Sequence, residues 1–328
     1  MSNDVQILIE NEGKYYYPAV LDGVELETEL RDVPGKLTFK VLKDEKLNFQ
    51  EGNHVKLTVN GKDVFYGFVF KKARDKNNII TVTAYDQLRY LKNKTCYVYD
   101  EAGEKASDVV KKLANLFQLQ AENITDTGFV IPPPRAEDNM TLFDIIGNAL
   151  TLTWEGSKKN YFIYDDVGKL TLKELDDESL RLNLLICDET AEDFDYTSSI
   201  DDNTYNSILL VQEDQKTKKR QGYPAVDAEN VKKWGVLRYF DKLSGNETTN
   251  PQDKANKLLE LYNSVTRTLT ISNAFGDVRV RAGVSLLCKL ALGDVDLSQY
   301  MVVISCKHTF DNEHHYMTLK LKGGEING

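Results

Sequence analysis

Cysteines and long apolar runs are both scarce in this sequence. Only four of the 328 residues are cysteines (Cys96, Cys187, Cys288 and Cys306), and no two of them form a CxxC pair. Structural zinc sites need closely spaced ligands, so zinc binding is not expected, and we predict four buried thiols that act as small apolar side chains. No run of 18 apolar residues is present, and no membrane insertion is expected.

The start of the chain lacks the basic segment and apolar stretch of a secretory signal, so we expect a protein made and assembled in the bacterial cytoplasm. Acidic residues outnumber basic ones, with 51 Asp or Glu against 41 Lys or Arg, and the net charge is −10. Residues 160–202 hold 13 Asp or Glu and 3 Lys or Arg, so the rest of the chain is neutral. A sequence-specific nucleic-acid surface needs a basic face and is not expected.

The acidic segment 160–202 leaves two interpretations open. Its carboxylates can lie in solvated turns between strands. They can also face a basic partner or line a water-filled channel, where charges more than about 8–10 Å apart are screened by salt.

None of the common catalytic motifs is present: there is no GxSxG, GxxxxGK[ST], GxGxxG after a strand, or HExxH. Cys306 and His308 are two residues apart on a predicted strand, but both face its apolar side, where an inert thiol is expected. We therefore predict no enzyme, no catalytic residue and no cofactor.

Three carboxylate doublets are the remaining candidates for acid–base chemistry: Asp165-Asp166, Asp176-Asp177 and Asp201-Asp202. A glycosidase needs two carboxyl groups held about 5–9 Å apart across a sugar cleft. Adjacent residues on a strand point to opposite faces, so the doublets are poor catalytic pairs. A cell-wall (peptidoglycan) hydrolase remains the alternative function.

Three of the four histidines gather near the C-terminus: His308, His314 and His315. His308 and His315 can meet across a predicted hairpin and hold a metal ion, or they can be structural. No further ligand at zinc spacing completes the set. We expect no metal site, and a structural histidine pair packed against Phe310 and Met317.

Residues 1–95 have the aromatic and β-branched composition of short strands. Asn60-Gly61 favours a two-residue type I′ turn between two alternating runs. This turn places Leu57 opposite Val64 on one buried face. The spacing of the strands predicts an N-terminal β-barrel over 1–95.

Residues 96–195 predict an α+β module. Ser107 is a candidate N-cap for one helix, and Thr141 with Asp144 forms a capping box for a second. A hairpin is expected around residues 165–168.

Residues 196–328 return to strand-like sequence and predict a second β-barrel with one helix and a polar loop at 212–250. Asn250 and Pro251 are typical of a helix start. A terminal turn at Asn312-Glu313 would place His308 opposite Met317. The predicted fold class is α+β, mainly β, with two small β-barrel domains and an inserted α/β module.

The order of several segments resembles the hub proteins of contractile tails, in particular the XkdQ-like family of defective prophages and contractile bacteriocins. The segments that carry the resemblance are VKLTVNGKDVFYGFVF, ITVTAYDQLRYL, ASDVVKKLANLFQL, NMTLFDIIGNAL, DYTSSIDDNTYNSILLV, KKWGVLRYFDKL, RTLTISNAFGDVRVRAGVSL and HTFDNEHHYMTLKLKG. Together they span nearly the whole chain.

The resemblance implies a structural hub of a contractile tail baseplate, a ring-shaped homotrimer that links the tail tube to the central spike. Its implied partners are the tube protein, the spike protein and other baseplate proteins, including a LysM-type tail protein. The implied location is the baseplate of a phage tail or tailocin particle. A hydrolase component of the tail and a sugar-binding adhesin are the alternatives, but fold-level likeness does not establish activity.

Overall fold

The computed structural model describes residues 4–133, 135–201, 203–213, 219–243, 250–291, 296–311 and 314–323. The fold is α+β and mainly β, as expected. Two compact units are present, Met1–Asp195 with Leu269–Gly323, and Tyr196–Thr268. The C-terminal strands thus group with the N-terminal strands, which differs from the expected domain at 196–328. Among the described residues, no helix is both long and apolar enough to cross a membrane.

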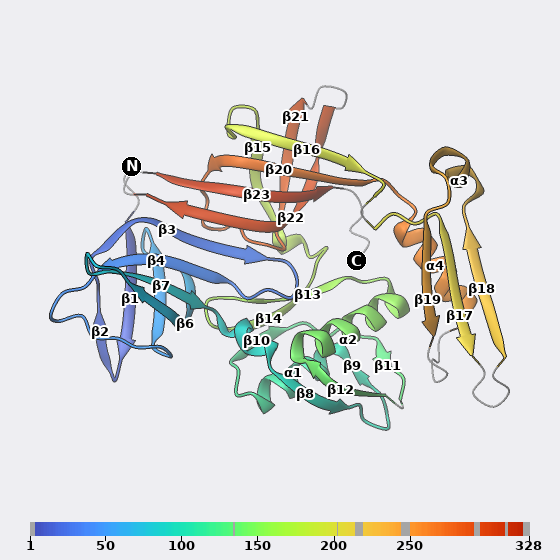
Figure 1. Cartoon of the computed structure of the whole chain (residues 1–328), viewed down its shortest axis with the longest axis horizontal. Helices are drawn as coiled ribbons and strands as arrows, with labels where there is room; N and C mark the ends of the chain where they lie inside the picture. The colour runs from blue at the N-terminus through green and yellow to red at the C-terminus, as the bar shows by residue number, and fades with distance from the viewer. Residues whose placement is uncertain are drawn as a thin grey trace. The chain divides into compact units, whose positions relative to one another are not determined.

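The larger unit is built on one main sheet (Figure 1). Its strands are β1 (Val5–Asn11), β2 (Lys14–Tyr16), β3 (Val20–Glu29), β4 (Lys36–Leu42), β5 (His54–Val59), β6 (Lys62–Arg74), β7 (Ile79–Tyr85), β15 (Arg181–Cys187), β20 (Thr266–Phe275), β21 (Ser285–Ala291), β22 (Asp296–Phe310) and β23 (His315–Gly323). Their order is β20-β23-β22-β3-β4-β7-β6-β5-β1-β2, with β21 branching from β22 and carrying β15.

Strand β22 joins the N-terminal and C-terminal strands. Its first part pairs with β21, its last part pairs with β3, and β23 pairs along its other edge. The two separate closed barrels expected from the sequence are not confirmed, because the described pairings form one sheet and none of them closes either group on itself. A strand of 15 residues is long enough to serve two neighbours on one edge, and alternation of apolar residues does not reveal which edges pair.

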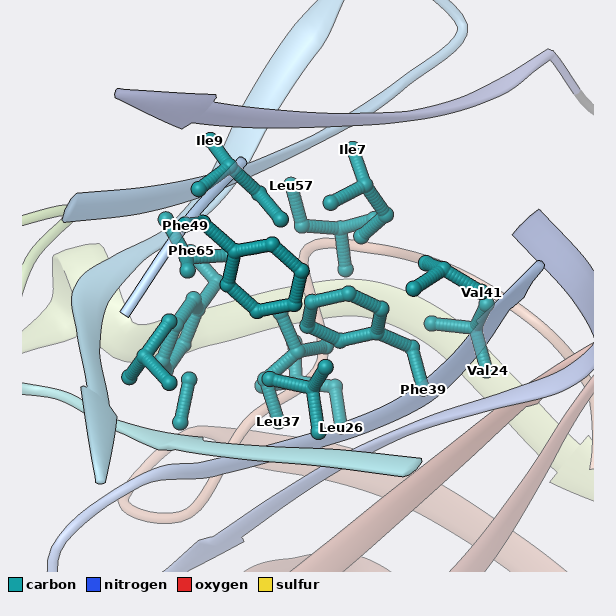
Figure 2. Packing of buried hydrophobic residues seen from close by; sticks show 14 of the residues in the cluster. Ile7, Ile9, Val24, Leu26, Leu37, Phe39, Val41, Phe49, Leu57 and Phe65 are labelled. Atoms are coloured by element: carbon teal, nitrogen blue, oxygen red, sulfur yellow. The ribbon is translucent and has the colours of Figure 1, made fainter. Parts of the chain in front are cut away.

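The strands next to the N-terminus enclose one apolar core. Buried residues alternate along β4, β5 and β7, as expected for strands with one inward face. Figure 2 shows Ile7 and Leu57 on one side of the Phe39 ring and Leu26 and Leu37 on the other. Sheet curvature around this core leaves the opposite face of β5 and β6 for other contacts.

The hairpin between β5 and β6 has the predicted turn and a different register. Asn60 and Gly61 both have positive φ, at 50° and 77°, as a type I′ turn requires. A bulge then follows, so Leu57 pairs with Phe65 and not with Val64. One extra residue exchanges the faces of a strand, and Phe65 therefore takes the buried place expected for Val64.

The rest of the larger unit is an α+β module with its own apolar core (Figure 1). Its elements are η1 (Gln87–Lys92), β8 (Lys94–Val98), β9 (Glu104–Lys105), α1 (Ala106–Leu116), β10 (Ala121–Ile124), β11 (Val130–Ile131), β12 (Ala136–Thr141), α2 (Leu142–Ser157), β13 (Tyr161–Asp165), β14 (Leu170–Glu174) and η2 (Glu178–Leu180). The strands form a β10-β14-β13 sheet and two pairs, β11-β9 and β12-β8.

The second helix of this module begins as predicted and the first does not. Thr141 and Asp144 form the capping box of α2. Helix α1 has Lys105 as its N-cap, and Ser107 lies inside the helix, where it is buried. The Asp108 carboxylate, at the third helical position, accepts the backbone N–H of Lys105 (3.3 Å), which is the reverse of the contact predicted for an N-cap Ser107. The hairpin around residues 165–168 is confirmed as β13 and β14.

The smaller unit has a β18-β17-β19 sheet with helix α4 packed on β17 and β18. Its elements are β17 (Ser207–Glu213), β18 (Arg220–Val226), α3 (Ala228–Trp234), β19 (Arg238–Leu243) and α4 (Pro251–Tyr262), and β16 (Asp193–Ser199) spans the division between the units. Asn250 caps α4 as predicted. The expected polar loop at 212–250 instead contains β18, α3 and β19. The described part of residues 196–328 therefore holds two helices, α3 and α4, where one was predicted.

The terminal hairpin keeps part of its predicted register. His308 pairs with Met317 as expected, and a bulge between Val303 and Ser305 then brings Val303 opposite Leu321. The predicted turn residues Asn312 and Glu313, and Asp202 of the third doublet, lie outside the described residues. Of the four thiols predicted to be buried, Cys288 and Cys306 are buried, Cys187 is half-buried and Cys96 is exposed.

Candidate functional site

The two histidines of the terminal hairpin meet. His308 Nδ1 lies 2.8 Å from His315 Nε2, and His308 Nε2 lies 2.8 Å from the carbonyl oxygen of Val280. A carbonyl only accepts, so His308 donates from Nε2 and its Nδ1 accepts from His315. The Phe310 ring stacks on His315 with centroids 4.3 Å apart. Both nitrogens of His308 are therefore occupied by protein groups.

Burial governs the chemistry of this pair. It lowers the pKa of His308 and of His315 to about 4, so both rings are neutral at pH 7. Cys306 Sγ lies 3.3 Å from His308 Nε2, but burial raises the pKa of this thiol and keeps it protonated. A protonated, inaccessible thiol is not a nucleophile. No group of three or more His, Cys, Asp or Glu in the described part of the chain is arranged to hold a metal.

Asp165, from the first acidic doublet, lies near the carboxylate of Asp86. Asp86, the N-cap of η1, is only 5% exposed, and its two oxygens accept the backbone N–H groups of Gly35 (2.8 Å) and Leu88 (3.0 Å). Asp165 accepts the N–H of Gly168 (2.6 Å), and its Oδ2 is inaccessible to solvent and has no hydrogen-bond partner among the described residues. Sequence reasoning missed Asp86, because it lies 79 positions before Asp165 in the chain.

Both carboxylates of this pair resist ionisation. Burial raises the pKa of Asp86 well above its usual range, and the charge of Asp165 adds to the effect. Burial also raises the pKa of Asp165 to about 6, against the lowering effects of Gly168 and Gln87. A raised carboxyl pKa is typical of catalytic acids as well as of structural pairs. Here the enclosure of both groups limits contact with a substrate.

The other members of the doublets lie on the surface. Asp166 and Asp176 are exposed. Asp177 caps η2, where the backbone N–H of Ser179 lowers its pKa. Asp201 is exposed as well, so among the described residues no doublet has both of its carboxylates buried.

An aromatic groove of about 340 Å³ lies within the larger unit, beside this carboxylate pair. The aromatic groove is walled by the rings of His54, Tyr66, Phe68, Tyr90 and Phe117. The rings form a connected cluster: the centroids of His54 and Phe68 are 4.9 Å apart, and those of Phe68 and Tyr90 are 5.6 Å apart. The hydroxyl of Tyr66 lies 2.7 Å from His54 Nδ1, which holds the first two rings together.

Three glutamines, Gln87, Gln118 and Gln120, also line the aromatic groove, together with Leu119 and Gly168. The side chain of Gln87 donates to the backbone carbonyl of Gln120 and accepts its N–H, both at 3.0 Å. These two hydrogen bonds fix the segment after α1 to the start of η1. Burial raises the pKa of Tyr66 and Tyr90, so their phenols are neutral at pH 7.

The free edge of the main sheet carries two exposed aromatic side chains. Tyr15 is 63% exposed and Tyr17 is 70% exposed, on and directly after β2. β2 pairs with β1 alone among the described strands, so its other edge presents unpaired backbone groups. An exposed edge of this kind can pair with another chain.

Known proteins resemble the chain along most of its length. A family model described as YQBQ-like matches residues 24–322. The uncharacterized protein YqbQ of Bacillus subtilis is 29% identical over 306 residues, which cover 92% of this chain and 91% of that protein. The phage-like element PBSX protein XkdQ, also of Bacillus subtilis, is 28% identical over 271 residues, which cover 82% of this chain and 81% of that protein.

Two solved structures share the fold. The 43 kDa tail protein of prophage MuSo2 from Shewanella oneidensis superposes with a TM-score of 0.69 at 12% identity, covering 96% of this chain and 98% of that one. The E. coli c3393 protein is described as a type VI secretion component with structural similarity to the bacteriophage T4 tail proteins gp27 and gp5. It superposes with a TM-score of 0.56 at 8% identity, covering 97% of this chain and 77% of that one.

Proposed function

Because the chain belongs to the YQBQ-like family, we propose that it is a non-enzymatic structural hub at the centre of a contractile tail baseplate. The observation that carries the proposal is the fold shared along almost the full length of both chains with a prophage tail protein. The E. coli secretion component, itself described as similar to T4 tail proteins, supports the same assignment.

In this proposal the hub is a ring-shaped homotrimer that connects the tail tube to the central spike. The β-rich N-terminal and C-terminal parts of each subunit form two barrel-like groups of strands, so three subunits present six similar faces to a six-fold tube. The free edge at β2 is a suitable contact between neighbours, because pairing would satisfy its backbone groups and cover Tyr15 and Tyr17.

The partners in this proposal are the tube protein, the spike protein and other baseplate proteins, including a LysM-type tail protein. The chain assembles with them in the bacterial cytoplasm and remains in the baseplate of a phage or tailocin particle. It makes no sequence-specific contact with nucleic acid, in keeping with its net charge of −10.

The proposal assigns no catalytic, cofactor or metal residue. Its support is the enclosure of the groups with unusual pKa values: Asp86, Asp165 and His308 all have protein atoms around their reactive atoms. The raised pKa of Asp165 is the one feature that favours the alternative, a cell-wall hydrolase of the tail. A hydrolase would release soluble fragments from peptidoglycan and lose this activity in Asp165→Asn.

Native mass spectrometry of the chain, alone and together with its tube and spike proteins, tests the hub. We expect a species of three times the 37.3 kDa chain mass that retains both partners. Tyr15→Lys with Tyr17→Lys should reduce the trimer, whereas Leu116→Lys should not, although Leu116 is also 64% exposed. A chain that stays monomeric with both partners present contradicts the proposal.

A further inference from the structure

The aromatic groove has the properties of a ligand site and takes no part in the proposed hub contacts. We propose that it binds a neutral saccharide chain. Its volume of about 340 Å³ lies within the roughly 300–1,000 Å³ of small-molecule sites. Its walls come from β5, β6, η1 and the segment after α1, and Gln87 fixes this segment against η1. The site is therefore formed before any ligand enters.

The absence of charge in the lining selects the class of ligand. The described residues that line the aromatic groove include no Asp, Glu, Lys or Arg. The phenols of Tyr66 and Tyr90 are neutral at pH 7, and the nearby Asp86 and Asp165 accept backbone N–H groups and do not line the aromatic groove. An anionic or cationic ligand would lose its hydration without an opposite charge in return. A neutral ligand avoids this cost.

The rings offer surfaces that suit a sugar. Phe68 and Tyr90 meet at an interplanar angle of 73°, so they form two walls of one corner, both half-buried with part of each ring accessible. One face of a pyranose ring carries mainly C–H bonds and packs on aromatic rings, as apolar groups do. Phe117, in the segment after α1, supplies a further ring to the lining. Two or three sugar units can thus contact rings in succession.

Hydrogen-bonding groups are available beside these rings. Gln118 and Gln120 are exposed, and their side-chain amides have no partner among the described residues. Each amide can donate and accept, as can the hydroxyl of Tyr90. Sugar hydroxyls also donate and accept hydrogen bonds, so each unit of the saccharide can bond to such groups. A mainly apolar site with a few polar groups is the usual composition of a ligand pocket.

The nearby carboxylates do not make this site hydrolytic. Both oxygens of Asp86 accept backbone N–H groups, and Oδ2 of Asp165 is inaccessible to solvent. Neither can protonate a glycosidic oxygen in the aromatic groove without a change of structure. The proposal is therefore that the site binds a saccharide without cleaving it. Saccharide binding does not depend on the trimer, so an experiment can contradict either proposal without contradicting the other.

Isothermal titration of the full chain with neutral tetrasaccharides of N-acetylglucosamine and of glucose tests this inference. We expect at least one to bind with a dissociation constant between about 0.1 and 5 mM. Phe68→Ala and Tyr90→Ala should each weaken binding roughly three- to tenfold. Phe275→Ala should not, although that ring is 66% exposed. Mass spectrometry should recover the sugar uncleaved.

Gln118→Ala keeps the test valid if loss of a ring unfolds the protein, because Gln118 is exposed and its truncation should weaken binding about twofold or more without changing the thermal midpoint. The inference is overturned if neither sugar binds at about 10 mM. It is equally overturned if binding is the same in Phe68→Ala, Tyr90→Ala and Gln118→Ala. Binding of a proline-rich peptide at this site in place of the sugars also contradicts it.

Discussion

His308 and His315 share a hydrogen bond of 2.8 Å across the terminal hairpin, and burial holds the pKa of each at about 4. The ordinary histidine pKa is near 6.5. Between pH 6.5 and pH 4 the unfolded chain binds protons that the folded chain does not. The pair therefore stabilises the fold fully above pH 6.5, and this contribution is lost as the pH falls through that range.

His315→Gln tests this effect. On going from pH 7 to pH 5, the unmodified chain should lose about 1–2 kcal/mol more of its free energy of unfolding than the variant does, after a discount for the partial exposure of His315. Urea unfolding at the two pH values measures the difference. Exposed His314 is the matched control, and His314→Gln should follow the unmodified chain. Equal pH dependence in all three would contradict the buried, neutral pair.

Asp165 changes the stability of the fold with pH in the opposite direction to the histidine pair. Its pKa of about 6 in the folded chain is above its ordinary value of 3.8, so the folded chain is favoured at low pH and this contribution is lost as the pH rises through 6. Asp165→Asn should stabilise the protein at pH 7 by about 1–2 kcal/mol and flatten its stability between pH 4 and pH 7. Asp166→Asn, at the exposed neighbour, should change little.

A destabilised Asp165→Asn protein at pH 7 would show that the carboxylate is held ionised by favourable contacts. The pH curve of the unmodified chain alone does not decide this. As the pH falls, the raised pKa values of Asp86 and Asp165 favour the folded chain, whereas the lowered pKa of the histidine pair disfavours it. Only the difference in the free energy of unfolding between a variant and the unmodified chain isolates the contribution of the carboxylate pair or of the histidine pair.

Gly35 is required by its contact with Asp86. A Cβ at Gly35 would overlap the Asp86 carboxylate that its own N–H binds. Gly35→Ala should lower the free energy of unfolding by about 1–3 kcal/mol, as overpacking does. Gly147 is the matched control, because a Cβ there meets nothing within 4 Å inside helix α2. Gly147→Ala should stabilise by about 0.5–1 kcal/mol. Similar effects from both substitutions would contradict the assigned contact.

Local signals in the sequence were sufficient for several elements of the fold. Thr141 with Asp144, Asn250 with Pro251, and Asn60-Gly61 each predict one local structure, because a cap or a turn depends on residues within four positions. The structure has all three. Their physical cause lies within the chain segment itself.

The bulges and the sheet edges were not predictable in this way. Each bulge, after Leu57 and after Val303, changes a register by one residue without a distinctive residue in the sequence. The pairing of β22 with β3 joins residues about 280 positions apart. The aromatic groove and the Asp86–Asp165 pair could not be predicted for the same reason, since their members come from separate segments of the larger unit.

The acidic segment yields a prediction about assembly. Asp176 and Glu178 are exposed, whereas Asp177 caps η2 and pairs with Lys173 at 3.9 Å. Asp176→Asn with Glu178→Gln therefore removes charge without removing the cap. If this surface meets a basic baseplate protein, the double variant should bind it about two- to tenfold more weakly at low salt and depend less on salt. Unchanged binding to tube, spike and neighbouring proteins places these carboxylates in solvated turns.

Electron microscopy of a particle that contains this chain tests the central claim most directly. The account predicts three copies in a ring on the tail axis, between the tube and the spike, with β2 of each copy at a contact between neighbours. Copies placed at the periphery of the baseplate, or a number other than three on the axis, would contradict the assignment as a hub.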